Sequence, residues 1–241
     1  MQSDKCEFTR NKIRFLTVLI VGISWLLVGF DFGGALPNFG ADLGRKSVMG
    51  KEFRIPYMDM ANYFGYVSPG SEPDEVVGGK KMYYLYMWIP AVAPEIGVRM
   101  ISPVKGLAKP VKGDFVDPKF TANADTDDYF DVWVQLERCT AVVNPVDIAK
   151  PCGSWSKYGE NDDSSELPAQ PSGSKYNSLM RITSAPSDPL KALARGMYRV
   201  GFTSYKVGEV KGSFLAQIGA PVKLPGIAIA RTPAELANLV K

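Results

Sequence analysis

The sequence contains no histidine in its 241 residues. Imidazole is the usual general base beside a nucleophilic serine or cysteine, and it is a common zinc ligand. Its absence therefore excludes Ser-His-Asp triads, Cys-His pairs and histidine-ligated zinc together. A hydrolase with this sequence would have to work through carboxylates or lysines. The missing residue type favours a non-enzymatic function.

The chain also has little net charge, +3, from 28 basic and 25 acidic residues. It shows no basic stripe with interleaved aromatic residues, so nucleic acid is not expected as a partner. Hydrophobic residues make up 46% and charged residues 22%, which is typical of a folded globular protein. A chain of this length forms one large domain or two small ones, and an all-β sandwich often reaches this size as one.

One long apolar run, Phe15–Phe30, contains no charged residue and follows the basic residues Lys5, Arg10, Lys12 and Arg14. A basic segment followed by an apolar one is typical of a secretory signal. The alternative is a membrane anchor, because the run is close to the lower limit of about 17 residues for a spanning helix. Gly33–Ala35 offers small residues for cleavage before Leu36. We therefore expect a signal peptide or N-terminal membrane anchor over residues 1–35 and the mature domain over residues 36–241.

Beyond Leu36 the sequence predicts short strands joined by long polar connections. The clearest alternation is Asp131–Glu137, where Val132, Val134 and Leu136 share one face. Many short strands bounded by Gly, Pro, Asn and Ser favour an antiparallel β-sandwich or barrel. The predicted strands are Asn62–Val67, Met82–Ile89, Val98–Ile101, Tyr129–Val142, Asn177–Thr183, Met197–Tyr205 and Val210–Ile218.

Helices are expected to be few. Asp188–Leu193 is a short candidate, and Ala234–Val240 is a clearer one, since Thr232 precedes Pro233 and Glu235 in a capping box. Lys206–Gly212 reads as a charged hairpin. Gly153–Ser174 is interpreted as a long loop within one domain, with a linker between two domains as the alternative.

Cysteine is scarce, at three residues, and two of them lie thirteen positions apart. In an oxidising compartment Cys139 and Cys152 could form a disulfide that contributes roughly 3 kcal/mol. The alternative is two free thiols, one of them buried as a small hydrophobic residue. The sequence leaves both open.

Two acidic clusters are candidates for a metal site. One contains Asp125, Asp127, Asp128 and Asp131, and the other contains Glu160, Asp162, Asp163 and Glu166. Calcium takes six to eight oxygen ligands, mostly from carboxylates, carbonyls and water, so converging clusters could bind one ion. No EF-hand pattern is present, and a solvated acidic surface is the alternative.

Three segments, in order, resemble the major surface lipoprotein family of Leptospira: Tyr83–Pro103, Lys175–Ile182 and Arg195–Phe214. The resemblance extends from about Leu36 to Lys241. It implies a single jelly-roll-like antiparallel β-sandwich with added helices, at the outer membrane or cell surface, with the periplasm as the alternative. It also implies a homodimer and binding of extracellular-matrix proteins or other surface ligands.

The resemblance further implies a set of calcium ligands. The family binds calcium through the strand that matches Phe130–Trp133, through two adjacent acidic loop residues and through the tyrosine of the KYNSL match. The corresponding residues here are Asp131, Val132, Asp162, Asp163 and Tyr176. Val132 replaces a threonine, so only its carbonyl could bind, and the loop is less acidic than the family's.

The family's acylated cysteine has no counterpart at the end of the apolar run, where this chain has Phe30 and Asp31. Cys6 lies before the run and is misplaced for that role. We therefore expect the mature chain to start near Leu36 without a diacylglyceryl group, with membrane association through the N-terminus as the alternative.

These observations favour a non-enzymatic, calcium-binding, adhesin-like surface protein. A structural envelope protein that acts through self-association is the second hypothesis. A carboxylate-based hydrolase, using paired acids as glycosidases do, is the third. The aromatic residues Tyr83, Tyr84, Tyr86 and Trp88 could form a binding surface, although such a run also fits a sheet core.

Overall fold

The computed structural model describes residues 44–48, 51–55, 57–185, 187–188, 191–206 and 208–240. The expected signal or anchor over residues 1–35, and its boundary at Leu36, lie outside the described residues. No helix in the described ranges is long and apolar enough to cross a membrane.

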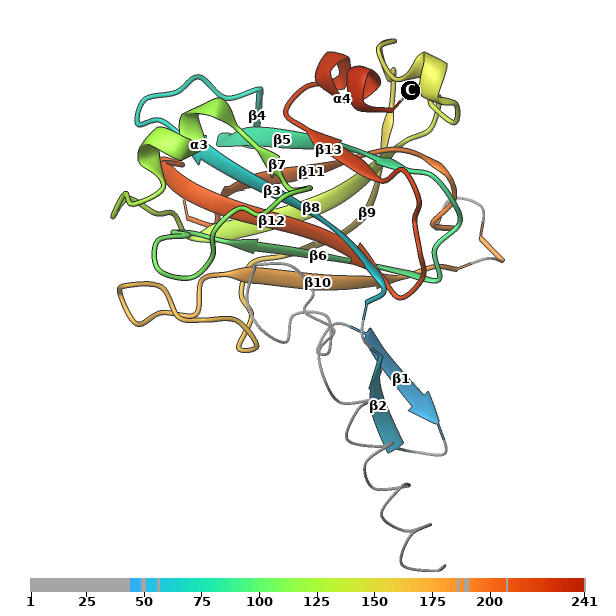
Figure 1. The fold of residues 1–241 in the computed structure, drawn as a ribbon, viewed down its shortest axis with the longest axis horizontal. Helices are drawn as coiled ribbons and strands as arrows, with labels where there is room; N and C mark the ends of the chain where they lie inside the picture. The colour runs from blue at the N-terminus through green and yellow to red at the C-terminus, as the bar shows by residue number, and fades with distance from the viewer. Residues whose placement is uncertain are drawn as a thin grey trace, which may run out of the picture. The chain divides into compact units, whose positions relative to one another are not determined.

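The main body is a sandwich of two sheets (Figure 1). Every neighbouring pair of strands is antiparallel except β3 and β7. The first sheet has the spatial order β10 (Ser178–Thr183), β6 (Glu95–Ile101), β12 (Gly212–Ala220), β3 (Asp59–Val67) and β7 (Phe115–Val116). The second has the order β13 (Ala228–Ala230), β5 (Lys80–Ile89), β11 (Gly196–Ser204), β8 (Val132–Cys139) and β9 (Trp155–Asn161), with β4 (Glu75–Val77) paired to β5. Separately, β1 (Gly44–Val48) pairs with β2 (Lys51–Ile55).

The hydrophobic core fills the space between the two sheets. The alternation predicted in Asp131–Glu137 is confirmed, since Val132, Val134 and Leu136 are fully buried there. Their neighbours Trp133 and Gln135 are half-buried on the outer face of β8. Each predicted strand overlaps an observed one, and the antiparallel β-sandwich expected from the sequence is confirmed.

Short helices cover the outer faces of the sheets. Phe120 of α3 (Pro118–Asn123) packs against Phe64 of β3, with ring centroids 5.2 Å apart. Leu236 of α4 (Pro233–Leu239) is buried among side chains from the outer face of the second sheet. The predicted capping box is present, because Thr232 accepts from the Glu235 amide and Glu235 accepts from the Thr232 amide.

Three local predictions were wrong. The described residues of Asp188–Leu193 form hydrogen-bonded turns, with the amides of Lys191 and Ala192 donating to the Asp188 carbonyl. Lys206–Gly212 is not a hairpin, because β11 and β12 belong to different sheets. Strand β9 lies inside the segment interpreted as a long loop.

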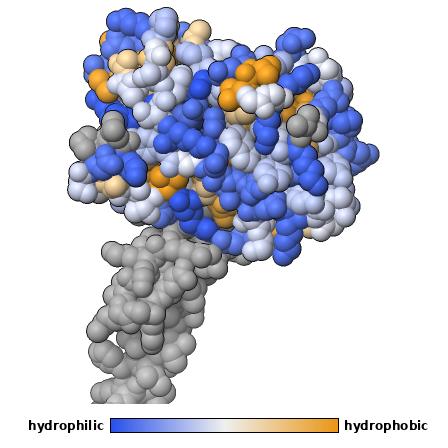
Figure 2. Space-filling view, turned by 180° about the vertical axis from the view of Figure 1, so that it is seen from behind, coloured by the Kyte–Doolittle hydropathy of each residue, from blue (hydrophilic) through white to orange (hydrophobic). Residues whose placement is uncertain are grey.

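The aromatic run of β5 belongs mainly to the folded interior. Tyr83, Tyr84 and Trp88 are buried, and Tyr86 is half-buried. The face seen in Figure 2 is mostly hydrophilic, with small separate hydrophobic patches. These tyrosines and the tryptophan therefore do not supply the broad aromatic surface considered above.

A disulfide joins Cys139, the last residue of β8, to Cys152, which precedes β9. Their Cα atoms are 5.7 Å apart, within the range that a disulfide spans. The bridge closes the connection between two paired strands. Of the two possibilities left open by the sequence, the structure has the disulfide.

The outer face of the second sheet holds an ion pair inside an aromatic sandwich. The Arg199 Nε lies 2.6 Å from a carboxylate oxygen of Glu137, directly across from it on β8. The guanidinium stacks between Tyr84 at 3.8 Å and Trp155 at 4.3 Å. Both charged side chains are nearly buried, at 13% and 12% exposure.

Candidate functional site

The residues predicted as calcium ligands lie at one end of the β8–β9 pair. Asp131 and Val132 stand at the start of β8, while Asp162 and Asp163 directly follow the last residue of β9. The two strands run antiparallel, with Val134 opposite Asn161, so the start of one meets the end of the other. Pairing of the two strands thus brings the two acidic positions to the same sheet end.

Tyr176 joins this end from the segment before β10. Its carbonyl accepts a hydrogen bond of 2.9 Å from the Val132 amide. The Val132 side chain is fully buried in the core, so only its backbone carbonyl is left to act as a ligand. Gln170 also donates to the Tyr176 carbonyl, at 3.5 Å, so an ion bound there would displace this longer hydrogen bond.

Asp131 carries the most informative atom of the site. Its Oδ1 is buried and has no hydrogen-bond partner in the described part of the chain. A buried carboxylate oxygen without a partner is costly unless a cation or donor satisfies it. This orphaned oxygen fits the donor chemistry of a hard cation such as calcium.

The three carboxylates influence one another electrostatically. Burial raises the pKa of the Asp131 carboxyl, and the nearby charge of Asp163 raises it further, while Lys206 acts in the opposite direction. Partial burial raises the pKa of Asp163, and its neighbour Asp162 adds to this rise. Mutual repulsion of this kind is what a bound cation relieves.

The carboxylates do not by themselves form a closed metal cluster. Within the described residues, no three acidic or cysteine side chains meet closely enough to hold a metal ion. The side chains of Asp162 and Asp163 are half-buried and exposed, respectively, and the Asp162 carboxylate accepts from the Asp163 amide at 3.0 Å. The expected ligand set differs from such a cluster, because two of its five ligands are the backbone carbonyls of Val132 and Tyr176.

Two amide residues that the sequence did not single out hold the surrounding backbone. Asn161 donates to the carbonyls of Asp163 at 2.8 Å and Leu179 at 3.0 Å. Buried Gln170 donates to the carbonyls of Ser102 at 2.8 Å and Phe130 at 2.7 Å. Neither residue belongs to a recognisable motif, and no local signal in the sequence marks it.

The fold and this site together define a β-sandwich domain that gathers polar loop groups at one end of a sheet. A family model described as a surface lipoprotein of the order Spirochaetales matches residues 51–229. The chain belongs to this family of spirochaete surface lipoproteins, as its resemblance to the leptospiral proteins predicted. No curated protein matches the chain. Family membership supports a location in the cell envelope or at the cell surface.

Proposed function

We propose that this chain is a calcium-binding, adhesin-like surface protein of the cell envelope, without enzymatic activity. The observation that carries the calcium proposal is the buried, unpartnered Oδ1 of Asp131, beside the charges of Asp162 and Asp163. The carbonyls of Val132 and Tyr176 complete the proposed ligand set. When bound, calcium supplies a positive charge that offsets the repulsion among the three carboxylates.

The proposed ion would tie the first residues after β9 to the start of β8. The later part of the β9–β10 connection is held without it, since Leu167 is buried and Gln170 and Asn177 make buried hydrogen bonds. Ordering by calcium is therefore confined to the neighbourhood of Asp162 and Asp163. The segment that calcium would order is therefore shorter than the whole β9–β10 connection. Charge repulsion considered alone would have predicted movement of the entire connection.

Adhesion is proposed on family membership and on the architecture of the domain. A rigid sandwich presents its loops at fixed positions, and recognition residues commonly lie on loops held by such a scaffold. The proposed partners are extracellular-matrix proteins or other surface ligands, bound by a homodimer. Outer-membrane rather than periplasmic location is part of the same proposal.

Calcium titration of the mature domain tests the proposed calcium site. Binding to the native state alone raises the free energy of unfolding by about 2.7 kcal/mol at a hundredfold excess over Kd. We expect the melting temperature to rise with calcium, to return with chelator, and to respond less to magnesium, which demands a tighter octahedral shell. Hydrogen exchange should slow around Asp162 and Asp163, while the amides of Leu167 and Gln170 stay unchanged.

The variants Asp131→Asn and Asp163→Asn should abolish the calcium response, whereas the matched control Asp125→Asn, on an exposed residue of the preceding acidic segment, should keep it. A melting curve that ignores millimolar calcium, with no heat of binding, would refute the site. Adhesion is tested separately with immobilised extracellular-matrix proteins against serum albumin. Equal retention on both surfaces would favour a structural, self-associating role.

A further inference from the structure

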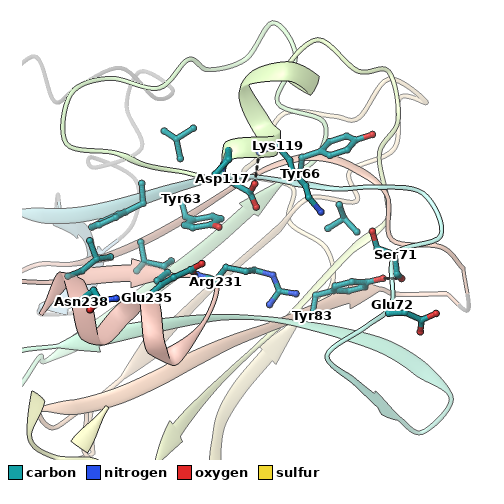
Figure 3. A pocket seen from close by; sticks show the side chains of 17 residues that line it. Tyr63, Tyr66, Ser71, Glu72, Tyr83, Asp117, Lys119, Arg231, Glu235 and Asn238 are labelled. Carbon is teal, nitrogen blue, oxygen red and sulfur yellow. Dashed lines mark hydrogen bonds between the residues drawn. The ribbon is translucent and has the colours of Figure 1, made fainter. Parts of the chain in front are cut away.

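A cavity of about 710 Å³ opens between the two sheets, away from the proposed calcium ligands. Figure 3 shows its walls: β3, β7 and the start of α3 on one side, β13 and α4 on the other. Its volume lies within the roughly 300–1,000 Å³ typical of small-molecule sites. It shares no residue with the proposed calcium site.

Aromatic rings in this cavity are held in fixed positions. Tyr83 stacks on Phe202 with centroids 5.7 Å apart, and its hydroxyl donates to the Ser71 carbonyl at 2.8 Å. Tyr63 stacks on Phe214 at 6.2 Å. Tyr66 is half-buried and contributes a third ring to the lining. Rigid rings provide contact area at a small entropic cost on binding.

The polar groups of the cavity are also oriented by the fold. Asp117 caps α3 by accepting from the Lys119 amide at 2.7 Å, and Glu235 caps α4 by accepting from the amides of Arg231 and Thr232 at 3.1 Å. Arg231 lies 2.7 Å from Asp74. Backbone capping and ion pairing thus fix the carboxylates and the guanidinium around the cavity.

The charges that line the cavity nearly balance. Three lining residues are acidic (Glu72, Asp117 and Glu235), and two are basic (Lys119 and Arg231). A charged ligand of either sign would meet repulsion from part of this set. A purely apolar ligand would remove the charged groups from water without giving them partners. The lining therefore favours a neutral ligand that is rich in hydrogen-bond donors and acceptors.

We propose that this cavity binds a short neutral oligosaccharide. A sugar ring presents an apolar C–H face, which packs on aromatic rings, and a rim of hydroxyl groups that both donate and accept. Tyr66, which is half-buried, matches the first feature, and the buried rings of Tyr63 and Tyr83 support the lining beside it. Each wall also carries one carboxylate and one basic group, Asp117 with Lys119 and Glu235 with Arg231. These match the second feature, since carboxylates accept and the lysine and arginine donate.

Isothermal titration of the mature domain with cellotriose, maltotriose and chitotriose tests this proposal, with octanoate as the apolar anionic comparison. At least one trisaccharide should bind, and octanoate should not. Tyr66→Ala and Lys119→Ala should each weaken that binding by about tenfold, equivalent to about 1.4 kcal/mol. Lys119 is suitable because its side chain is exposed and forms no ion pair among the described residues, so its removal leaves the fold intact.

Two matched controls remove the same residue types outside the cavity. Tyr205→Ala removes an exposed tyrosine after β11, and Lys112→Ala removes an exposed lysine before β7. Both should bind the trisaccharide as the unmodified chain does. Absence of binding to all three sugars at about 10 mM, which corresponds to a Kd far weaker than 1 mM, would overturn the proposal. So would binding of octanoate alone, or sugar binding that Tyr66→Ala and Lys119→Ala leave unchanged.

Discussion

Asp131 illustrates how one carboxylate can be set apart by its surroundings. Its backbone carbonyl accepts from the Tyr205 amide at 2.8 Å, and its Oδ1 is buried without a hydrogen bond from the described residues. The positive charges of Lys206 and Lys80 act on the same group. Burial and the neighbouring acidic residues outweigh these lysines, so the net effect is a raised pKa.

The raised pKa of Asp131 has a direct consequence for pH dependence. An acid whose pKa is higher in the folded state contributes stability below its unfolded pKa, and this contribution is lost as pH rises through the folded value. In calcium-free protein, stability from Asp131 should therefore decline as pH rises out of the acid range. Calcium binds the ionised carboxylate, so its stabilisation should grow over the same interval.

Melting curves with calcium and with chelator, recorded from pH 3.5 to 7, measure both trends (the usual aspartate pKa is about 3.9). The two sets of curves should converge at the acid end and separate toward neutral pH. In Asp131→Asn the separation should vanish at every pH. A calcium effect that is constant with pH would contradict the assignment of Asp131 as a ligand.

A second prediction for single residues concerns the ion pair of Arg199 and Glu137. Arg199→Met removes the cation and leaves the nearly buried Glu137 carboxylate unpaired, which should lower the free energy of unfolding by about 3 kcal/mol. The double variant Arg199→Met with Glu137→Met removes both charges and should recover most of the loss. Chemical denaturation of the two variants gives both values, and equal losses would argue against a buried pair.

At the level of elements, the alternation of apolar residues predicted the buried strands correctly. It did not reveal a polar strand at the edge of a sheet. Strand β8 was recognisable because Val132, Val134 and Leu136 repeat every second residue. Strand β9, with the sequence WSKYGEN, is an edge strand without a fully buried side chain, so it has no such repeat. The hairpin expected at Lys206–Gly212 failed for another reason, since no local residue reveals that consecutive strands enter different sheets.

The positions of the candidate site were predictable only where a family motif marked them. Matches to a known family indicated Asp131, Val132, Asp162, Asp163 and Tyr176, and the structure brings these residues to one sheet end, while calcium binding by them stays a prediction. Asn161 and Gln170, which hold the surrounding backbone, were missed. Their role depends on carbonyls as distant in sequence as Ser102, and such tertiary hydrogen bonds leave no trace in a single sequence.

The disulfide supplies a prediction for the β8–β9 element. Cys139 and Cys152 are thirteen positions apart, and closing a loop of this size contributes about 3 kcal/mol on the chain-entropy model. The double variant Cys139→Ser with Cys152→Ser should lose about this amount in urea denaturation. Reducing agent should destabilise the unmodified chain similarly and leave the variant unaffected. Equal stability of the oxidised and reduced chains would contradict this contribution.

At the scale of the whole molecule, strands that neighbour each other in space are far apart in sequence. β12 lies between β6 and β3 in the first sheet, with Ala216 opposite both Tyr63 and Met100. We predict that a chain ending at residue 205, which lacks β12, β13 and α4, does not fold. A chain ending at residue 232, which lacks only α4, should fold with reduced stability. Near-ultraviolet circular dichroism distinguishes the two, and a native spectrum from the shorter chain would contradict the prediction.

The position of β12 also determines when this protein can acquire its structure. β3 is made early and β12 late, so a chain that emerges from its N-terminal end first exposes β3 without its central neighbour. Non-local pairing of this kind slows folding, and the unpaired edge of β3 is prone to aggregate until β12 is available. We expect the sandwich of this surface protein to stay incomplete until β12 has been made, and this delay would keep the chain in an unfolded state that can cross a membrane.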